Sequence, residues 1–257
     1  SCMKHKFLLI LAILVFFILY TTHLYTEDMK TRKEPFDTNK AMMLLYGGQT
    51  WTSSDLKRYF KGQTTGYISV AYELGYNEKN SEKHFVIFHI TPEPAEQYMC
   101  HACTPLIGGA IYTKTKDSWA IETKSMIIGR GNAFGEKMSL VSIGKDRHAV
   151  MLSISDAHQG YQTKYINLIV PYNNKLNVTL NVGFIEKPGP GACGEATPEQ
   201  KVEIKFDETG NSEYFNIAAK IQYNEGSCQN HIVNKKTAIY KFVKGRYKLI
   251  SVSEKGR

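Results

Sequence analysis

Residues 65–74 read TGYISVAYEL, a polar segment reads NEKNSEK (77–83), and residues 85–90 read FVIFHI. Branched and aromatic side chains dominate both apolar segments, and such side chains pack well on the pleated surface of a strand. A short turn can join only antiparallel neighbours. We therefore predict a β-hairpin, with residues 85–90 near the middle of its sheet because that segment is continuously apolar.

The same pattern occurs three times along the chain. In each unit a strand, a short turn and a second strand are followed by a loop, a third strand, a short turn and a fourth strand. The first unit continues with AIYTKT (110–115) and WAIETK (119–124), the second comprises MSLVSI (138–143), AVMLSIS (149–155), YINLIV (165–170) and LNVTLNV (176–182), and the third comprises VEIKF (202–206), YFNIAAKIQY (214–223), TAIYKFV (237–243) and RYKLISV (246–252). Alternation in WAIETK and in YKLISV predicts half-buried strands. Each unit is thus predicted to be a four-stranded antiparallel meander.

The predicted fold class is mainly β, with three repeated four-stranded meander units after an N-terminal membrane helix. A four-stranded meander is typical of a β-propeller blade, but closure of a propeller normally needs at least ~4 blades. A propeller-like domain and a curved sandwich or barrel made from the same strands are both open at this point.

The N-terminal part of the chain predicts membrane attachment. Phe7 to Tyr20 is an unbroken apolar run, and extension to Tyr25 gives about 19 residues, or ~28 Å of helix. No small-x-small cleavage motif follows the run, so an uncleaved signal-anchor is favoured over a cleaved signal. With the N-terminus in the cytoplasm, we expect a single-pass protein of a bacterial inner membrane, its domain in the periplasm or outside the cell. The basic residues at 30, 32 and 33 favour the opposite orientation, because basic residues beside a membrane helix are usually on its cytoplasmic side.

Three segments follow from these patterns: a signal-anchor over 1–26, a tether with a short helical lead-in over 27–64, and an exported β-rich domain over 65–257. Apolar residues at helical spacing lie between Asn39 and Lys61. Ser53 or Ser54 is a candidate N-cap for a short helix that follows.

The charge balance predicts a solubilising surface. The chain has 32 Lys and Arg against 24 Asp and Glu, a formal net charge of +8. No block of like charges and no basic stripe interleaved with aromatic residues is visible, and most lysines fall at turns, so we expect no nucleic-acid partner.

Unusual residues collect in the connections at one end of the predicted meanders, where long loops on a rigid scaffold commonly carry binding or catalysis. The candidate binding residues in these loops are His101, Gly129, Arg130, Asn132, His158, Gln159, Tyr161 and His231. The motif GRGNAFG (129–135) lacks phosphate-loop spacing, and its glycines are expected to supply positive φ at a corner between strands.

Four cysteines lie in the same connections: Cys100, Cys103, Cys193 and Cys228. For an exported domain, structural disulfides are the first expectation. We predict a bridge between Cys193 and Cys228 and another between Cys100 and Cys103, while two longer bridges from the CHAC motif (100–103) to Cys193 and Cys228 are the rival pairing. Metal binding and redox activity of CHAC are weaker alternatives, and no metal or other cofactor is expected.

The resulting hypothesis is a membrane-tethered envelope protein that binds a protein or cell-wall partner through its cysteine-rich loop end. One alternative is a thiol redox or metal-dependent enzyme that uses Cys100 and Cys103. Another is an envelope immunity or inhibitor protein. No catalytic signature identifies the chain as an enzyme.

Overall fold

The computed structural model describes residues 35–92, 104–131, 137–158, 161–183, 186–188, 201–209, 212–226 and 231–254. Contacts group Asp37–Lys114 and Trp119–Arg257 in one compact unit and assign Ser1–Phe36 and Thr115–Ser118 to another. In the latter, the described turn is closed by a hydrogen bond from Thr115 N to Ser118 O (2.8 Å). The predicted signal-anchor lies outside the described residues. Within the described ranges, no helix has the length and hydropathy needed to cross a membrane.

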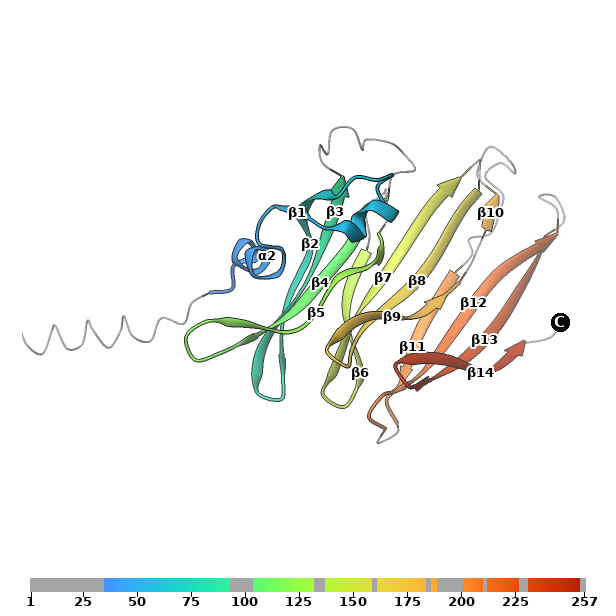
Figure 1. The fold of residues 1–257 in the computed structure, drawn as a ribbon. Coiled ribbons are helices and arrows are strands. Elements are labelled where there is room, and N and C mark those ends of the chain that lie inside the picture. The colour runs from blue at the N-terminus through green and yellow to red at the C-terminus, as the bar shows by residue number, and fades with distance from the viewer. Residues whose placement is uncertain are drawn as a thin grey trace, which may run out of the picture. The chain divides into compact units, whose positions relative to one another are not determined.

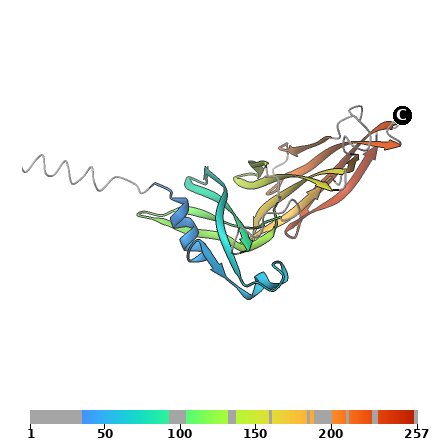
Figure 2. The ribbon, with the colours of Figure 1, turned by 90° about the horizontal axis from the view of Figure 1, so that it is seen from above.

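Three antiparallel sheets form the larger unit (Figures 1 and 2), so the prediction of a mainly β, antiparallel domain is confirmed. Sheet A comprises β1 (Thr50–Thr52), β2 (Thr65–Glu78), β3 (Ser81–Pro92), β4 (Leu106–Lys114) and β5 (Trp119–Arg130). Sheet B comprises β6 (Lys137–Gly144), β7 (Arg147–His158), β8 (Tyr161–Tyr172), β9 (Lys175–Val182) and β10 (Glu186–Pro188). Sheet C comprises β11 (Lys201–Asp207), β12 (Asn216–Gly226), β13 (His231–Val243) and β14 (Arg246–Glu254).

Tight turns keep consecutive strands side by side. Both central residues of the β8–β9 turn have positive φ, Asn173 at 51° and Asn174 at 58°. The β13–β14 turn has the same geometry, with Lys244 at 49° and Gly245 at 84°. Such turns match the twist of the strands that they join. The three-residue strands β1 and β10 were not predicted from the sequence.

The segment before the first long strand folds onto sheet A. Helix α2 (Thr38–Tyr46) begins at Asp37, whose side chain accepts a hydrogen bond from Asn39 N (2.8 Å). A 3-10 helix, η1 (Ser54–Arg58), is capped by the side chain of Ser53, which confirms the predicted cap. Capping satisfies backbone N–H groups that have no partner within the helix.

Buried tyrosines attach α2 to the outer face of sheet A. The Tyr112 hydroxyl donates to Ala41 O (2.7 Å), and the Tyr46 hydroxyl donates to Met126 O (2.9 Å). Gly108 leaves room for the Tyr46 hydroxyl, because a Cβ at this position would collide with it.

Strand β3 lies in the middle of sheet A, as its apolar run predicts. Phe85 and Ile87 point into a core shared with sheet B. On the opposite face Phe88 is fully buried and packs edge-on against Tyr46 of α2. Burial on both faces explains why the segment does not alternate between apolar and polar residues.

Sheet B has two buried faces. Val150 and Leu152 of β7 join the core with sheet A, whereas Ala149 lies in a second core with sheet C. In β8, Ile169 faces sheet A and Val170 faces sheet C. The continuous apolar runs in the second unit therefore belong to a sheet that lies between two others.

The predicted alternation in the last strand is only partly correct. Tyr247 is buried, but Leu249 is 53% exposed. The pairing of β13 with β14 shifts register between Ile239 and Tyr240, leaving Ile250 as an extra residue. Such a bulge interrupts the period-two pattern, so Ser251, which pairs with Ile239, lies on the face opposite Tyr247 and Leu249.

Candidate functional site

Two adjoining pockets form the candidate binding site. The first has a volume of about 730 Å³ and is lined by β5, β9 and the β13–β14 turn. The second has a volume of about 530 Å³ and is lined by the β11–β12 connection and the end of β13. Tyr172 and Lys244 line both pockets, so a ligand that fills both would pass these two side chains.

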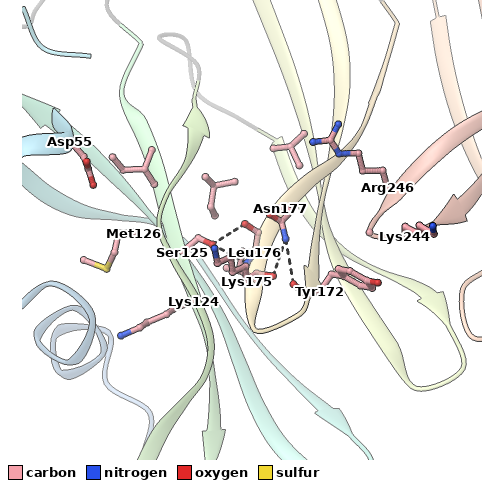
Figure 3. Close-up of a pocket in the computed structure, with 14 residues that line it drawn as sticks. Asp55, Lys124, Ser125, Met126, Tyr172, Lys175, Leu176, Asn177, Lys244 and Arg246 are labelled. Carbon is pink, nitrogen blue, oxygen red and sulfur yellow. Dashed lines mark hydrogen bonds between the residues drawn. The ribbon is translucent and has the colours of Figure 1, made fainter. Parts of the chain in front are cut away.

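Hydrogen bonds from neighbouring strands fix the floor of the first pocket (Figure 3). The Ser125 hydroxyl donates to Leu176 O (2.9 Å) and accepts from Leu176 N (3.0 Å). The Asn177 side-chain amide donates to Tyr172 O (3.5 Å) and Lys175 O (3.4 Å). One side chain of sheet A thus satisfies both backbone groups of a residue in sheet B, which holds β5 beside β9.

Positive charges surround this floor. The lining includes Lys124, Lys175, Lys244 and Arg246, against one carboxylate, Asp55. Figure 3 shows the Arg246 guanidinium above β9, whereas the Lys124 side chain points away on the other side of Leu176. The cations therefore stand on both sides of the pocket, an arrangement that attracts an anionic ligand from solution.

Aromatic rings form a wall of the second pocket. Tyr214 stacks on Phe242 with ring centroids 3.8 Å apart, and Tyr172 meets Phe242 edge-on at 5.6 Å. The Arg147 guanidinium lies 4.8 Å from the Tyr214 centroid and pairs with the Glu213 carboxylate. Burial raises the pKa of Tyr214 and outweighs the opposing effect of Arg147, so its phenol is neutral at pH 7.

A buried ion cluster at the β2–β3 hairpin has a structural role. Lys83 is 7% exposed, and its ammonium contacts Glu78 (2.5 Å) and Glu122 (2.8 Å). Burial by itself would raise the pKa of Glu122, but hydrogen bonds from Lys83 and Thr113 outweigh it and leave the pKa below its ordinary value. The cluster is absent from the lining of both pockets.

Most residues predicted for the site lie outside the described residues. These are Cys100, His101, Cys103, Asn132, Gln159, Cys193 and Cys228. For His158, Tyr161 and His231 the structure describes the backbone alone: His158 ends β7 opposite Tyr161, and His231 begins β13. The predicted disulfides stay predictions.

Gly129 and Arg130 are described, and they continue β5 rather than form a loop. Gly129 pairs with Ile107, and its φ is not positive, so the expected corner at this glycine is wrong. Pairing with β4 keeps the backbone extended through Arg130, whose guanidinium lies 5.8 Å from the Tyr59 ring centroid.

The β7–β8 connection is also shorter than predicted. The two strands pair up to His158 and Tyr161, which leaves only residues 159 and 160 between them. The expected long loop that holds His158, Gln159 and Tyr161 is therefore wrong, because the backbone pairing of β7 and β8 extends beyond the apolar segment of each strand.

The tight turns of neighbouring sheets meet at one end of the larger unit. His148 Nδ1 lies 3.5 Å from Glu78 Oε1 between sheets B and A, and Arg147 pairs with Glu213 between sheets B and C. Both pockets include residues from this end. Sequence reasoning missed the site, because its residues come from strands and turns that are far apart along the chain and look ordinary in the sequence.

Within the described part of the chain, no three His, Cys, Asp or Glu side chains come together as potential metal ligands. No protein-family model matches the sequence, and no curated protein matches it. Among solved structures, the chain aligns with the crystal structure of exotype rhamnogalacturonan lyase YesX at 9% identity and a TM-score of 0.34. The alignment covers 80% of this chain but 35% of the lyase chain, so this chain spans about a third of that protein's length. A likeness at this level carries no argument about fold or function.

Proposed function

We propose that this chain is a membrane-tethered envelope protein whose exported β domain binds an anionic protein or cell-wall partner in the two adjoining pockets. The observation that carries the proposal is the excess of cations around the first pocket, whose lining contains four basic residues and one acidic residue. A cleft lined by one sign of charge concentrates ligands of the opposite sign.

The second pocket adds a means of selectivity. Tyr172, Tyr214 and Phe242 offer ring surface beside the polar and charged groups of Glu213 and Lys241. Rings combined with a few polar groups are typical of sites that bind an organic ligand, because apolar contact supplies affinity and the polar groups set orientation.

The proposed site is therefore at the turn end of the sheets and not at the cysteine-rich loop end expected from the sequence. Contact of the partner with those loops as well stays a prediction, since the loop residues are mostly outside the described ranges. Cys100 and Cys103, on which the thiol enzyme depends, lie outside the described residues, so that alternative and the immunity protein both stay predictions.

Binding to isolated cell envelopes tests the proposal. Full-length protein in non-ionic detergent should co-sediment with detergent-washed cell walls of the source organism. The variant K124Q/K175Q/K244Q/R246Q should bind at least about tenfold more weakly, a loss of ~1.4 kcal/mol or more.

The matched control is K57Q/R58Q/K137Q/K145Q, which removes three lysines and one arginine at exposed positions outside the pockets. It should bind within twofold of the parent protein. An equal loss in both variants would mean that binding depends on the total charge of the protein and not on the pocket. Unchanged binding in the pocket variant would refute the proposal.

Attachment to the membrane has a separate test. Alkaline phosphatase fused after Lys61 should be active and remain in the membrane fraction, as expected for an uncleaved anchor with an exported domain. Activity confined to the soluble periplasmic fraction would indicate cleavage. An inactive but intact fusion would indicate the inverted orientation.

Of the two architectures left open by the sequence, we favour sandwich-like packing. Sheets A and B share one core, and sheets B and C share another. The outer face of sheet A is covered by α2 and η1, whereas that of sheet C carries exposed lysines. Closure of a propeller would instead pack the first and last sheets together.

A further inference from the structure

Strand register gathers lysines on one face of sheet C. Ile217, Ala219 and Ile221 of β12 point into the core with sheet B. The alternate residues of β12, and the residues paired with them, therefore point to the outer face. Five exposed lysines lie on this face: Lys205 on β11, Lys220 on β12, Lys235 and Lys241 on β13, and Lys248 on β14.

Acidic residues offset only part of this charge. Among the described outer-face residues, Glu203 pairs with Lys220 across the strands, and Asp207 pairs with Asn216. Glu203 also contacts Lys205 (3.2 Å). Five lysines against two carboxylates leave an excess of three positive charges on one face of one sheet.

One pair of lysines is placed unfavourably for stability. Lys241 lies directly opposite Lys248 in the register of β13 and β14. Like charges in directly opposed positions destabilise a sheet, and an anion between them would relieve the repulsion.

We infer that the outer face of sheet C is a docking surface for a linear, phosphate-containing polymer of the envelope, as distinct from nucleic acid and lipid. Lysine presents a compact point charge that suits phosphate, and the flat bidentate fork of arginine is not needed for such a contact. Lys235 and Lys241 are six residues apart on β13, a span of ~20 Å at about 3.4 Å per residue. That distance fits a polymer rather than a single small ion.

The lysine face and helix α2 lie on opposite outer faces of the larger unit. Helix α2, where the chain leaves the N-terminal segment, packs on the outer face of sheet A. Sheet B lies between sheets A and C. The lysine face is thus on the far side of the sheets from α2.

Lys241 connects this face to the candidate site, because it also lines the second pocket. The inference rests on the proposed function only in taking the polymer to be a component of the envelope. Its test is a direct binding measurement that separates the lysine face from the pockets.

The experiment measures binding of long-chain inorganic polyphosphate to the full-length protein in non-ionic detergent at low salt. Substitution K205Q/K220Q/K235Q/K248Q, which leaves the pocket residue Lys241 in place, should weaken binding at least about tenfold and flatten its salt dependence, since fewer counterions are released. The control K57Q/K61Q/K137Q/K145Q removes four exposed lysines elsewhere and should stay within twofold. Inorganic phosphate should bind at least about a hundredfold more weakly than the polymer, because only the polymer engages several lysines together.

Three outcomes would overturn the inference: equal losses in both variants, no loss in the lysine-face variant, or tighter binding to phosphatidylglycerol vesicles or duplex DNA than to polyphosphate. The pocket variant K124Q/K175Q/K244Q/R246Q distinguishes the two proposals. If it abolishes cell-wall binding but keeps polyphosphate binding, the sites are separate. If the lysine-face variant keeps both polyphosphate binding and cell-wall binding, while the pocket variant loses cell-wall binding, the inference fails and the proposed function survives.

Discussion

At the scale of single residues, a few polar side chains join strands that are distant along the chain. The Ser125 hydroxyl bonds to both backbone groups of Leu176, and Lys83 lies between two carboxylates. Such groups are buried at a cost in solvation, so the removal of one partner leaves the others unsatisfied. The contacts of Ser125 with Leu176 and of Lys83 with Glu122 could not be predicted from the sequence, since each joins residues that are far apart along the chain.

Ser125→Ala should lower the free energy of unfolding by about 1–3 kcal/mol, because both backbone groups of Leu176 lose their partner. Urea denaturation followed by fluorescence measures the change. Ser69→Ala, at an exposed position of β2, serves as the control and should change stability by less than ~0.5 kcal/mol. Equal effects would mean that the hydroxyl contributes nothing specific.

Lys83→Met should destabilise the fold at pH 7, because Glu78 and Glu122 lose their shared cation. The expected loss exceeds the ~1 kcal/mol of an exposed pair and falls short of the ~3–5 kcal/mol typical of a fully buried pair, since the Glu122 side chain is 41% exposed. Chemical denaturation at pH 7 measures it.

The ion pair between Lys83 and Glu122 should make the free energy of unfolding depend on pH. The folded-state pKa of Glu122 lies below its ordinary value of 4.5. Its stabilising contribution is therefore present above that value and is lost as the pH falls through the folded-state pKa. In Lys83→Met this acid-induced loss should be smaller, and an unchanged pH profile would contradict the assignment.

At the scale of elements, the sequence predicted the long strands well. Short polar turns and apolar periodicity are local features, and they placed all twelve strands of the meanders. The two three-residue strands have too few residues for a pattern, and the longer β7–β8 pairing depends on partners across the sheet. The lysine face of sheet C could not be predicted from the sequence either, because the register of four strands brings its lysines together.

Gly245→Ala should both strain the β13–β14 turn and disturb the pockets. Gly245 has φ of +84°, and a Cβ there would lie 2.8 Å from Tyr172 Cδ1. Gly47→Ala is a matched control, because Gly47 has φ of +81° with no atom within 4 Å of its Cβ position.

Each substitution should cost ~1–2 kcal/mol from the left-handed backbone, measured by thermal or urea unfolding. Only Gly245→Ala should also weaken cell-wall binding, since Tyr172 lines both pockets. Loss of binding in both variants would point to global destabilisation instead.

At the scale of the whole molecule, stability depends on sheet B, whose two faces are both buried. Leu168→Ala in this sheet should cost about 2–5 kcal/mol, as expected when a buried leucine leaves a cavity. Leu249→Ala, where the side chain is 53% exposed, should cost far less. Denaturant unfolding measures both, and similar losses would contradict the assignment of sheet B as the middle layer.

The division of the chain into three meanders followed from the sequence, but the order of burial did not. FVIFHI in β3 and the apolar runs of β7 and β8 look alike as patterns, although the other side of β3 is covered by α2 and that of sheet B by sheet C. The pockets were missed for the same reason: Tyr172, Lys244 and Tyr214 come from different sheets and connections, and only tertiary packing brings them together.

The most direct test of the account is photocrosslinking in living cells from position 172. A photoreactive phenylalanine analogue placed at Tyr172 should crosslink to an anionic envelope component, and the same probe at Lys57 should not. The crosslink should disappear when Lys124, Lys175, Lys244 and Arg246 are replaced by glutamine. Absence of a crosslink at position 172, or an equal crosslink from position 57, would contradict the account.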